Sequence, residues 1–224
     1  MDKRLAFLSG LPRSGSTLLT SLLYQNPTIH TEGISALCDL MWQAQEALST
    51  DAIPANGRRS HADSMITRLP QMYYDNTNRP IVIDKCRAWT LEANMAMLRK
   101  YVSPTPKVIV MTRPIAEIER SFRNLFDRNG RADYETGGFQ TELERNILGV
   151  ADALADASSG SYHFVEYADL VADPQVILDG IYDFLELPRF AHQFTDIVNP
   201  NQENDLVHGL VGMHDVRPIL GILA

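Results

Sequence analysis

The chain has 224 residues, 45% of them hydrophobic and 21% charged, which is typical of a single globular domain with a substantial core. We therefore expect one domain over residues 1–224. The net charge of −8 argues against general nucleic-acid binding, which needs a broad basic face, but it leaves room for a local anion site built from a few arginines. No apolar run approaches the roughly 20 residues of a membrane-spanning helix, so no transmembrane segment is expected. Cys38 and Cys86 are too few for a Cys-rich zinc site and fit a reducing compartment.

The start of the chain, MDKRLAFLSGL, superficially resembles a short signal peptide, because two basic residues precede an apolar stretch. The stretch is too short, however, and it leads directly into a motif that requires this segment to be folded. We therefore expect a cytoplasmic protein.

Four short apolar runs predict strands, and each is followed by a turn or a helical pattern. Near-continuous apolar runs are typical of strands that are buried on both faces of a parallel sheet. The predicted strands are residues 5–9, 81–84, 107–112 and 162–166, and the predicted helices cover the leucine stripe at 18–23 and the ranges 91–101, 115–127, 140–157 and 175–186.

This alternation predicts a three-layer α/β/α fold around a central, mainly parallel sheet, with the ligand site at the carboxyl ends of the strands. The segment 50–80 contains three prolines and looks less regular. It could form a lid or an acceptor-binding region.

The loop from Gly10 to Thr17, GLPRSGST, lies between the first strand and the leucine-striped helix. In this strand–loop–helix geometry, backbone N–H groups and a helix N-terminus hold a phosphate. The loop nearly matches the nucleotide-triphosphatase pattern G-x-x-x-x-G-K-[ST], but Ser16 stands where the lysine should be and Arg13 is the only cation. An ordinary strand–turn–helix with a serine-rich cap is the alternative for the loop alone.

A second motif begins where the strand at 107–112 ends. Arg113 follows that strand, and Ser121 is two helical turns further on, so both could face one cleft. A guanidinium and a hydroxyl suit a second, separate phosphate. Alone, Arg113 could equally cap a helix or pair with Glu117.

Together, these motifs resemble the PAPS-dependent sulfotransferases, where PAPS is 3′-phosphoadenosine-5′-phosphosulfate. LPRSGSTLL is similar to the 5′-phosphosulfate loop in its arginine-containing form, found in tyrosylprotein and bacterial members. VIVMTRPIAEIERSF resembles the 3′-phosphate segment, and EYADLVADPQVILDGIYDFLELP, residues 166–188, resembles a third segment that brings Tyr167 toward the nucleotide. The matches span residues 5–188.

The resemblance implies a P-loop-nucleotide-hydrolase-like fold, PAPS as donor, its product PAP (3′-phosphoadenosine-5′-phosphate), and no metal. The residues implied in donor binding are Arg13, Ser14, Gly15, Ser16, Thr17, Leu18, Arg113, Ser121 and Tyr167. The Arg-Lys-Gly stretch of cytosolic members is absent. A glycine-rich segment with His214 and Arg217 could close on the 3′-phosphate instead, or it could contact the acceptor or simply pack.

Sulfuryl transfer needs a base within hydrogen-bond reach of the acceptor hydroxyl. Glu32 falls within a residue or two of the base of glutamate-type sulfotransferases and is our first candidate, with His30 as the alternative base. On a short strand both would point to the same face.

Lys85 follows the strand at 81–84 and resembles a lysine that glutamate-type members place near the bridging oxygen. It could stabilise charge on the leaving phosphate together with Arg13, or it could simply pair with Asp84 or a neighbouring carboxylate. Arg87 and Trp89 could shape the acceptor pocket.

Two other functions fit parts of this pattern. A nucleotide kinase would need the missing loop lysine and a magnesium-binding acid, for which Asp84, beside Lys85, is a poor candidate. A non-catalytic protein that binds PAP or PAPS would keep the nucleotide site without transfer. For an enzyme, the acceptor would be a hydroxyl on a small molecule, glycan or lipid. No motif indicates which acceptor it is, or what the oligomeric state is.

Overall fold

The computed structural model describes residues 2–48, 50, 59–134, 138–201 and 203–219. Its centre is a five-stranded sheet in the order β2-β3-β1-β4-β5, in which every neighbouring pair is parallel. The strands are β1 (Arg4–Gly10), β2 (Ile29–Ile34), β3 (Ile81–Lys85), β4 (Val108–Thr112) and β5 (Tyr162–Glu166).

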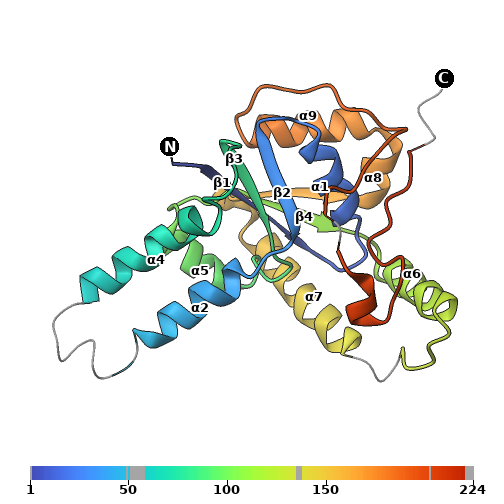
Figure 1. Ribbon diagram of the computed structural model, residues 1–224, viewed down its shortest axis with the longest axis horizontal. Coiled ribbons are helices and arrows are strands. Elements are labelled where there is room, and N and C mark those ends of the chain that lie inside the picture. Colours follow the sequence, from blue (N-terminus) through green and yellow to red (C-terminus); the bar gives the residue numbers. More distant parts are fainter. Residues whose placement is uncertain (1, 49, 51–58, 135–137, 202, 220–224) are drawn as a thin grey trace.

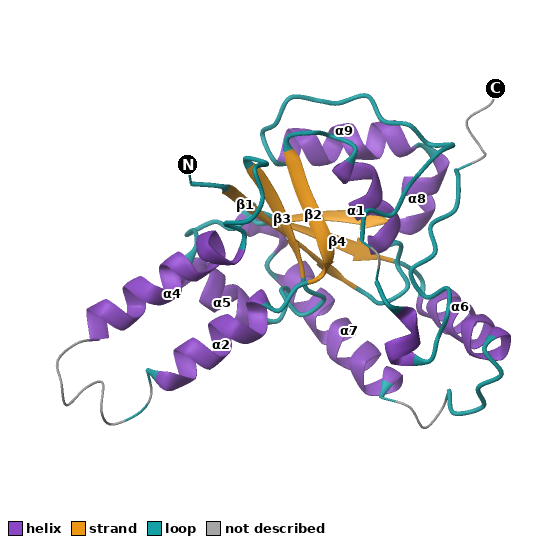
Figure 2. Cartoon of the chain, viewed as in Figure 1, coloured by secondary structure: helices purple, strands orange, loops and turns teal. Residues whose placement is uncertain are grey.

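Helices cover both faces of the sheet and produce three layers (Figure 2). One face packs against α1 (Ser16–Tyr24), α8 (Tyr167–Ala172) and α9 (Pro174–Phe184). The other face packs against α2 (Leu37–Ala47), α4 (Arg59–Tyr73), α5 (Glu92–Tyr101), α6 (Ile115–Arg128) and α7 (Phe139–Ala155). The predicted α/β/α fold with a parallel sheet is therefore confirmed.

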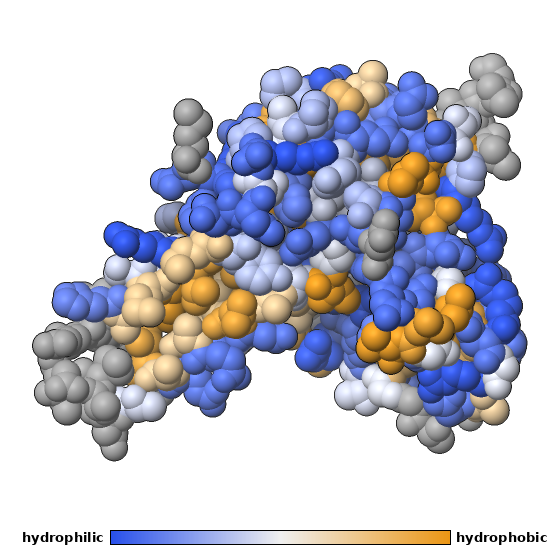
Figure 3. Space-filling view, viewed as in Figure 1, coloured by the Kyte–Doolittle hydropathy of each residue, from blue (hydrophilic) through white to orange (hydrophobic). Residues whose placement is uncertain are grey.

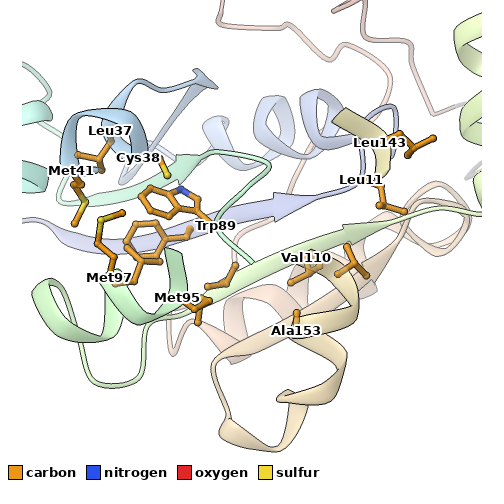
Figure 4. Packing of buried hydrophobic residues seen from close by; sticks show 14 of the residues in the cluster. Leu11, Leu37, Cys38, Met41, Trp89, Met95, Met97, Val110, Leu143 and Ala153 are labelled. Carbon is orange, nitrogen blue, oxygen red and sulfur yellow. The ribbon is translucent and has the colours of Figure 1, made fainter. Parts of the chain in front are cut away.

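The core on the second face is built around Trp89, which has no exposed surface. Its ring meets Phe7 of β1 edge to face, with 5.1 Å between ring centroids. Figure 4 shows Met41 and Met97 beside this pair, with Val110 of β4 further along the same layer. This packing fixes the segment after β3, and so the expectation that Trp89 shapes an acceptor pocket is wrong.

The four predicted strands appear within a residue of their expected bounds, but the segment 50–80 differs from its prediction. Its described part contains α4, which continues through Pro70, and α4 pairs with α2 in an arm that extends to the lower left of Figure 1. Prolines usually mark breaks in helices, which is why the sequence pattern concealed this one. Residues 51–58 of that segment lie outside the described residues.

The order of the strands fixes where a ligand site should lie. The chain leaves β1 toward β2 on one side of the sheet, and it leaves β4 toward β5 on the other. The loops after β1 and β4 therefore diverge at a topological switch point, where open α/β sheets bind ligands. Among the described helices, none is long and apolar enough to span a membrane.

Candidate active site

The loop between β1 and α1 has a backbone that few residues can adopt. Gly15 has φ +88°, and a methyl group added there would lie 2.5 Å from the ring of Tyr167. Arg13 also has a positive φ, 57°, which is uncommon for a residue with a side chain and costs conformational energy. The buried Ser14 hydroxyl donates to the Leu11 carbonyl at 2.5 Å, which stabilises the turn.

Arg113, at the end of β4, is tied directly to this loop. Its Nη1 donates to the Arg13 carbonyl at 3.1 Å, its Nε donates to Glu117 at 3.0 Å, and its guanidinium carbon lies 4.3 Å from the centroid of the Tyr167 ring. The Arg13 side chain in turn donates to Ser121 Oγ at 3.3 Å and to the Met213 carbonyl. The two sequence motifs therefore meet in space.

A cavity of about 670 Å³ opens between these groups. The face of the molecule seen in Figure 3 is mainly hydrophilic, with local apolar patches. The predicted donor-binding residues that line the cavity are Arg13, Gly15, Ser16, Thr17, Leu18, Arg113, Ser121, Tyr167 and Arg217. Ser14 is not among the described residues that line it, and its hydroxyl serves the loop instead.

The cavity is strongly cationic. Burial lowers the pKa of Arg13, and the charges of Arg128, Arg87 and Arg113 lower it further, whereas Asp205 raises it. Guanidiniums that repel one another in a partly buried cavity favour an anionic ligand.

Two lining arginines, Arg120 and Arg128, were missed in the sequence. Both lie on α6, three or four residues from other polar lining residues of that helix. The polar stripe that continues from Ser121 at helical spacing is the signal that would have found them.

Lys85 lies at the end of β3, and its Nζ is 3.5 Å from Thr17 Oγ1 in the first turn of α1. Its side chain is almost completely buried, which lowers its pKa to about 8. The charge of Glu203 opposes this shift and that of Arg87 adds to it. The structure therefore places Lys85 beside the phosphate-type loop, as expected.

Glu32 and His30 lie elsewhere, in β2. They share a face, with His30 Nε2 3.5 Å from Glu32 Oε2, and the Tyr74 hydroxyl lies 3.3 Å from Glu32 Oε1. Tyr74 also donates to Asp84 at 2.6 Å. Neither Glu32 nor His30 is among the described residues that line the cavity.

Asp84 is a buried scaffold carboxylate. It accepts hydrogen bonds from Ser35, Tyr74 and Trp89, each at 2.6 Å, and burial nevertheless raises its pKa. Among the described residues, no cluster of His, Cys, Asp or Glu side chains is arranged to hold a metal ion.

The fold and the cavity define an α/β protein with an arginine-lined cavity at the switch point of a parallel sheet. The model of the Sulfotransferase family matches residues 6–192, and the chain belongs to that family. No curated protein matches the sequence.

Solved structures share the fold at low sequence identity. The sulfotransferase domain of the Synechococcus PCC 7002 olefin synthase has a TM-score of 0.60 and 18% identity, with 99% of this chain and 86% of that chain covered. The sulfotransferase domain of the curacin biosynthetic pathway has a TM-score of 0.56 and 20% identity, with 85% and 76% covered. A sulfotransferase from Alicyclobacillus acidocaldarius has a TM-score of 0.55 and 16% identity, with 89% and 87% covered.

Proposed function

We propose that this sulfotransferase takes the sulfuryl group from PAPS and transfers it, without a metal ion, to a hydroxyl on a small molecule, glycan or lipid. The observation that carries the proposal is the meeting of the two anion-binding motifs on one arginine-lined cavity. The cavity volume of about 670 Å³ is within the range of sites that hold a nucleotide-sized ligand. The cytoplasmic location remains a prediction from the sequence.

The two ends of the cavity suit the two phosphate groups of the donor. The loop residues Gly15 to Leu18 offer backbone N–H groups and the N-terminus of α1 to the 5′-phosphosulfate. Arg113, after β4, and Ser121, in α6, suit the 3′-phosphate, and Arg217 lines the same cavity. Tyr167, stacked under Arg113, is placed to contact the nucleotide.

Transfer requires the acceptor oxygen in line with the bridging oxygen of the donor, and charge builds on the leaving phosphate. Lys85 and Arg13 are the cations proposed to stabilise that charge. A glutamate is proposed to take the proton of the hydroxyl. The sequence-based candidate is Glu32, with His30 as the alternative base.

Calorimetric titration with PAP in magnesium-free buffer, beside a titration with ATP, tests the donor site. We expect PAP to bind without metal and ATP to bind more weakly. Arg113→Ala should lose about 10- to 100-fold in PAP affinity, because a charged hydrogen bond contributes about 1.5–3 kcal/mol. Arg145→Ala, on the exposed side of α7, is the matched control and should bind as wild type does.

A requirement for magnesium, or tighter binding of ATP than of PAP, would contradict the proposal and favour a phosphotransferase. PAP binding without sulfation of any member of a broad hydroxyl library would instead favour a non-catalytic binding protein.

A further inference from the structure

A strap formed by residues 203–219 lies against the donor-site side of the sheet. Several long-range hydrogen bonds hold it there. Arg13 donates to the Met213 carbonyl, Arg131 Nη1 to the His208 carbonyl at 2.8 Å, and Asn129 both accepts from the Val211 N–H at 2.9 Å and donates to its carbonyl at 3.1 Å. In Figure 1 this segment runs beside α6 and α7. The strap is therefore a part of the cavity wall.

Glu203, at the start of the strap, occupies space that β2 leaves open. Its Oε1 lies 2.5 Å from the position that a methyl group on Gly33 would take. A register shift between Thr31 and Ile34 interrupts the pairing of β2 with β3 at this point, and such bulges redirect side chains. Because Gly33 has no side chain, the carboxylate of Glu203, which is far from it in the sequence, fits against β2.

The charge of Glu203 acts on Lys85, whereas the charge of Glu32 acts on Asp84. The charge of Glu203 raises the pKa of Lys85, and the charge of Glu32 raises the pKa of Asp84. Glu203, like Glu32, is not among the described residues that line the cavity, but its Oε1 lies 3.6 Å from Nε2 of His214, which does line it.

The two oxygens of Glu203 have different surroundings. Oε1 lies 3.6 Å from His214 Nε2, and His214 is oriented by Asp205, whose Oδ1 is 2.5 Å from Nδ1. Oε2 is buried and has no hydrogen-bond partner among the described residues. Buried polar atoms nearly always have partners, so an exception of this kind calls for a ligand or a chemical role.

We propose that Glu203 is the general base of the transfer and that His214, held by Asp205, positions it. This inference rests on the proposed function and assigns its proton acceptor. As the bond from the acceptor oxygen to sulfur forms, the bond from sulfur to the bridging phosphate oxygen breaks. The hydroxyl proton passes to Glu203 Oε2, and PAP leaves with the electron pair of the broken bond. Glu203 then returns the proton to water.

The test compares Glu203→Gln with Glu32→Gln, two isosteric changes, and with Glu144→Gln on the exposed side of α7 as the control. Release of PAP from PAPS is measured with phenol, 4-chlorophenol and 4-nitrophenol as acceptors and with water alone, which is always present. PAP affinity is measured in parallel by calorimetry.

We expect Glu203→Gln to lose about 100-fold or more in kcat with phenol, the usual contribution of a general base, at nearly unchanged PAP affinity. The loss should shrink toward 4-nitrophenol, about half of which is already ionised at neutral pH, because the ionised phenol needs no base. A merely structural role would reduce all three rates equally. His214→Gln should show the same trend with a smaller loss.

Turnover of Glu203→Gln within threefold of wild type, or an equal loss with every phenol, overturns the assignment. The assignment is also overturned if Glu32→Gln loses more kcat than Glu203→Gln does and if that loss shrinks as the phenol becomes more acidic. If wild type fails to bind PAP at all, the proposed function itself fails, and the calorimetry separates that outcome from a wrong base.

Discussion

Asp84 and Lys85 are neighbours on β3, yet they lie in two very different environments. Asp84 accepts three hydrogen bonds, all at 2.6 Å, from groups that hold α2, α4 and the segment after β3 around it. Lys85 is almost as deeply buried, but among the described residues its ammonium group makes a single hydrogen bond, a 3.5 Å contact to Thr17. A buried charged group whose hydrogen bonds are all made is typical of a structural role. A buried charged group that lacks hydrogen-bond partners is typical of a site that a ligand completes.

The same contrast separates the two glutamates. Glu32 lies in the network of Tyr74 and His30, on the side of Asp84. The charge of Glu203 acts on Lys85, and its Oε2 has no hydrogen-bond partner in the part of the chain that the structure describes. The comparison therefore divides the carboxyl edge of the sheet into a structural half around Asp84 and a proposed reactive half around Lys85, and we expect each half to respond differently to substitution.

The largest effect is expected in the structural half. Asp84→Ala would leave the donors of Ser35, Tyr74 and Trp89 without their acceptor, at about 1–3 kcal/mol for each buried unsatisfied group. We expect the free energy of unfolding to fall by about 3 kcal/mol or more. Urea unfolding measures this, with Asp196→Ala, at an exposed position, as the control. Equal unfolding midpoints for the two variants would contradict the scaffold role of Asp84.

The next effect concerns pH and the reactive half. In its proposed role Lys85 stabilises the leaving phosphate only when it is protonated, and its pKa is lowered to about 8. Turnover should therefore fall about tenfold per unit as pH rises above about 8. The groups that act on its charge are Glu203 from the strap and Arg87 after β3, with Thr17 in contact from α1.

Lys85→Arg tests the origin of this decline, because a guanidinium stays charged throughout the range. The residual activity of that variant should show no decline between pH 8 and 10.

The free energy of unfolding of wild type should rise over the pH range in which its turnover falls. The folded chain loses its proton at lower pH than the unfolded chain, so the free energy of unfolding should rise between about pH 8 and the ordinary pKa of lysine, 10.5. A kcat that stays flat to pH 10 would show that the charge of Lys85 is not used.

The smallest effect tests the contact between β2 and the strap. In Gly33→Ala, the new methyl group would lie 2.5 Å from Glu203 Oε1 and displace that carboxylate. We expect about a tenfold loss of kcat, and a change in unfolding free energy below about 1 kcal/mol, because the end of a flexible side chain can move. Gly138→Ala is the control, since an added methyl group there meets no atom within 4 Å. Equal kcat values would remove Glu203 from the reaction.

Much of the donor site could be predicted from the sequence because it is local. A strand, a loop and a helix N-terminus follow one another from Leu5 to Leu23, and Arg113, just before α6, is eight residues from Ser121 within that helix. Elements that follow one another directly in the chain produce motifs that can be recognised in the sequence. Tyr167 likewise begins α8 directly after β5, at the same edge of the sheet.

The rest depends on contacts that leave no such pattern. Glu203 reaches Gly33 across most of the chain, and the register shift in β2 that accompanies this contact is not visible in the sequence. The pairing of α2 with α4 was missed for a related reason, since Pro70 signals a break that the surrounding packing overrides.

The single residue Arg13 joins the two halves of the catalytic machinery that lie farthest apart in the sequence. Its carbonyl holds Arg113, and its guanidinium holds the carbonyl of Met213 in the strap. If the proposed donor binds this loop and favours this arrangement of Arg13, it also favours the contact between Arg13 and the strap, because a coupling between two contacts of one residue is reciprocal.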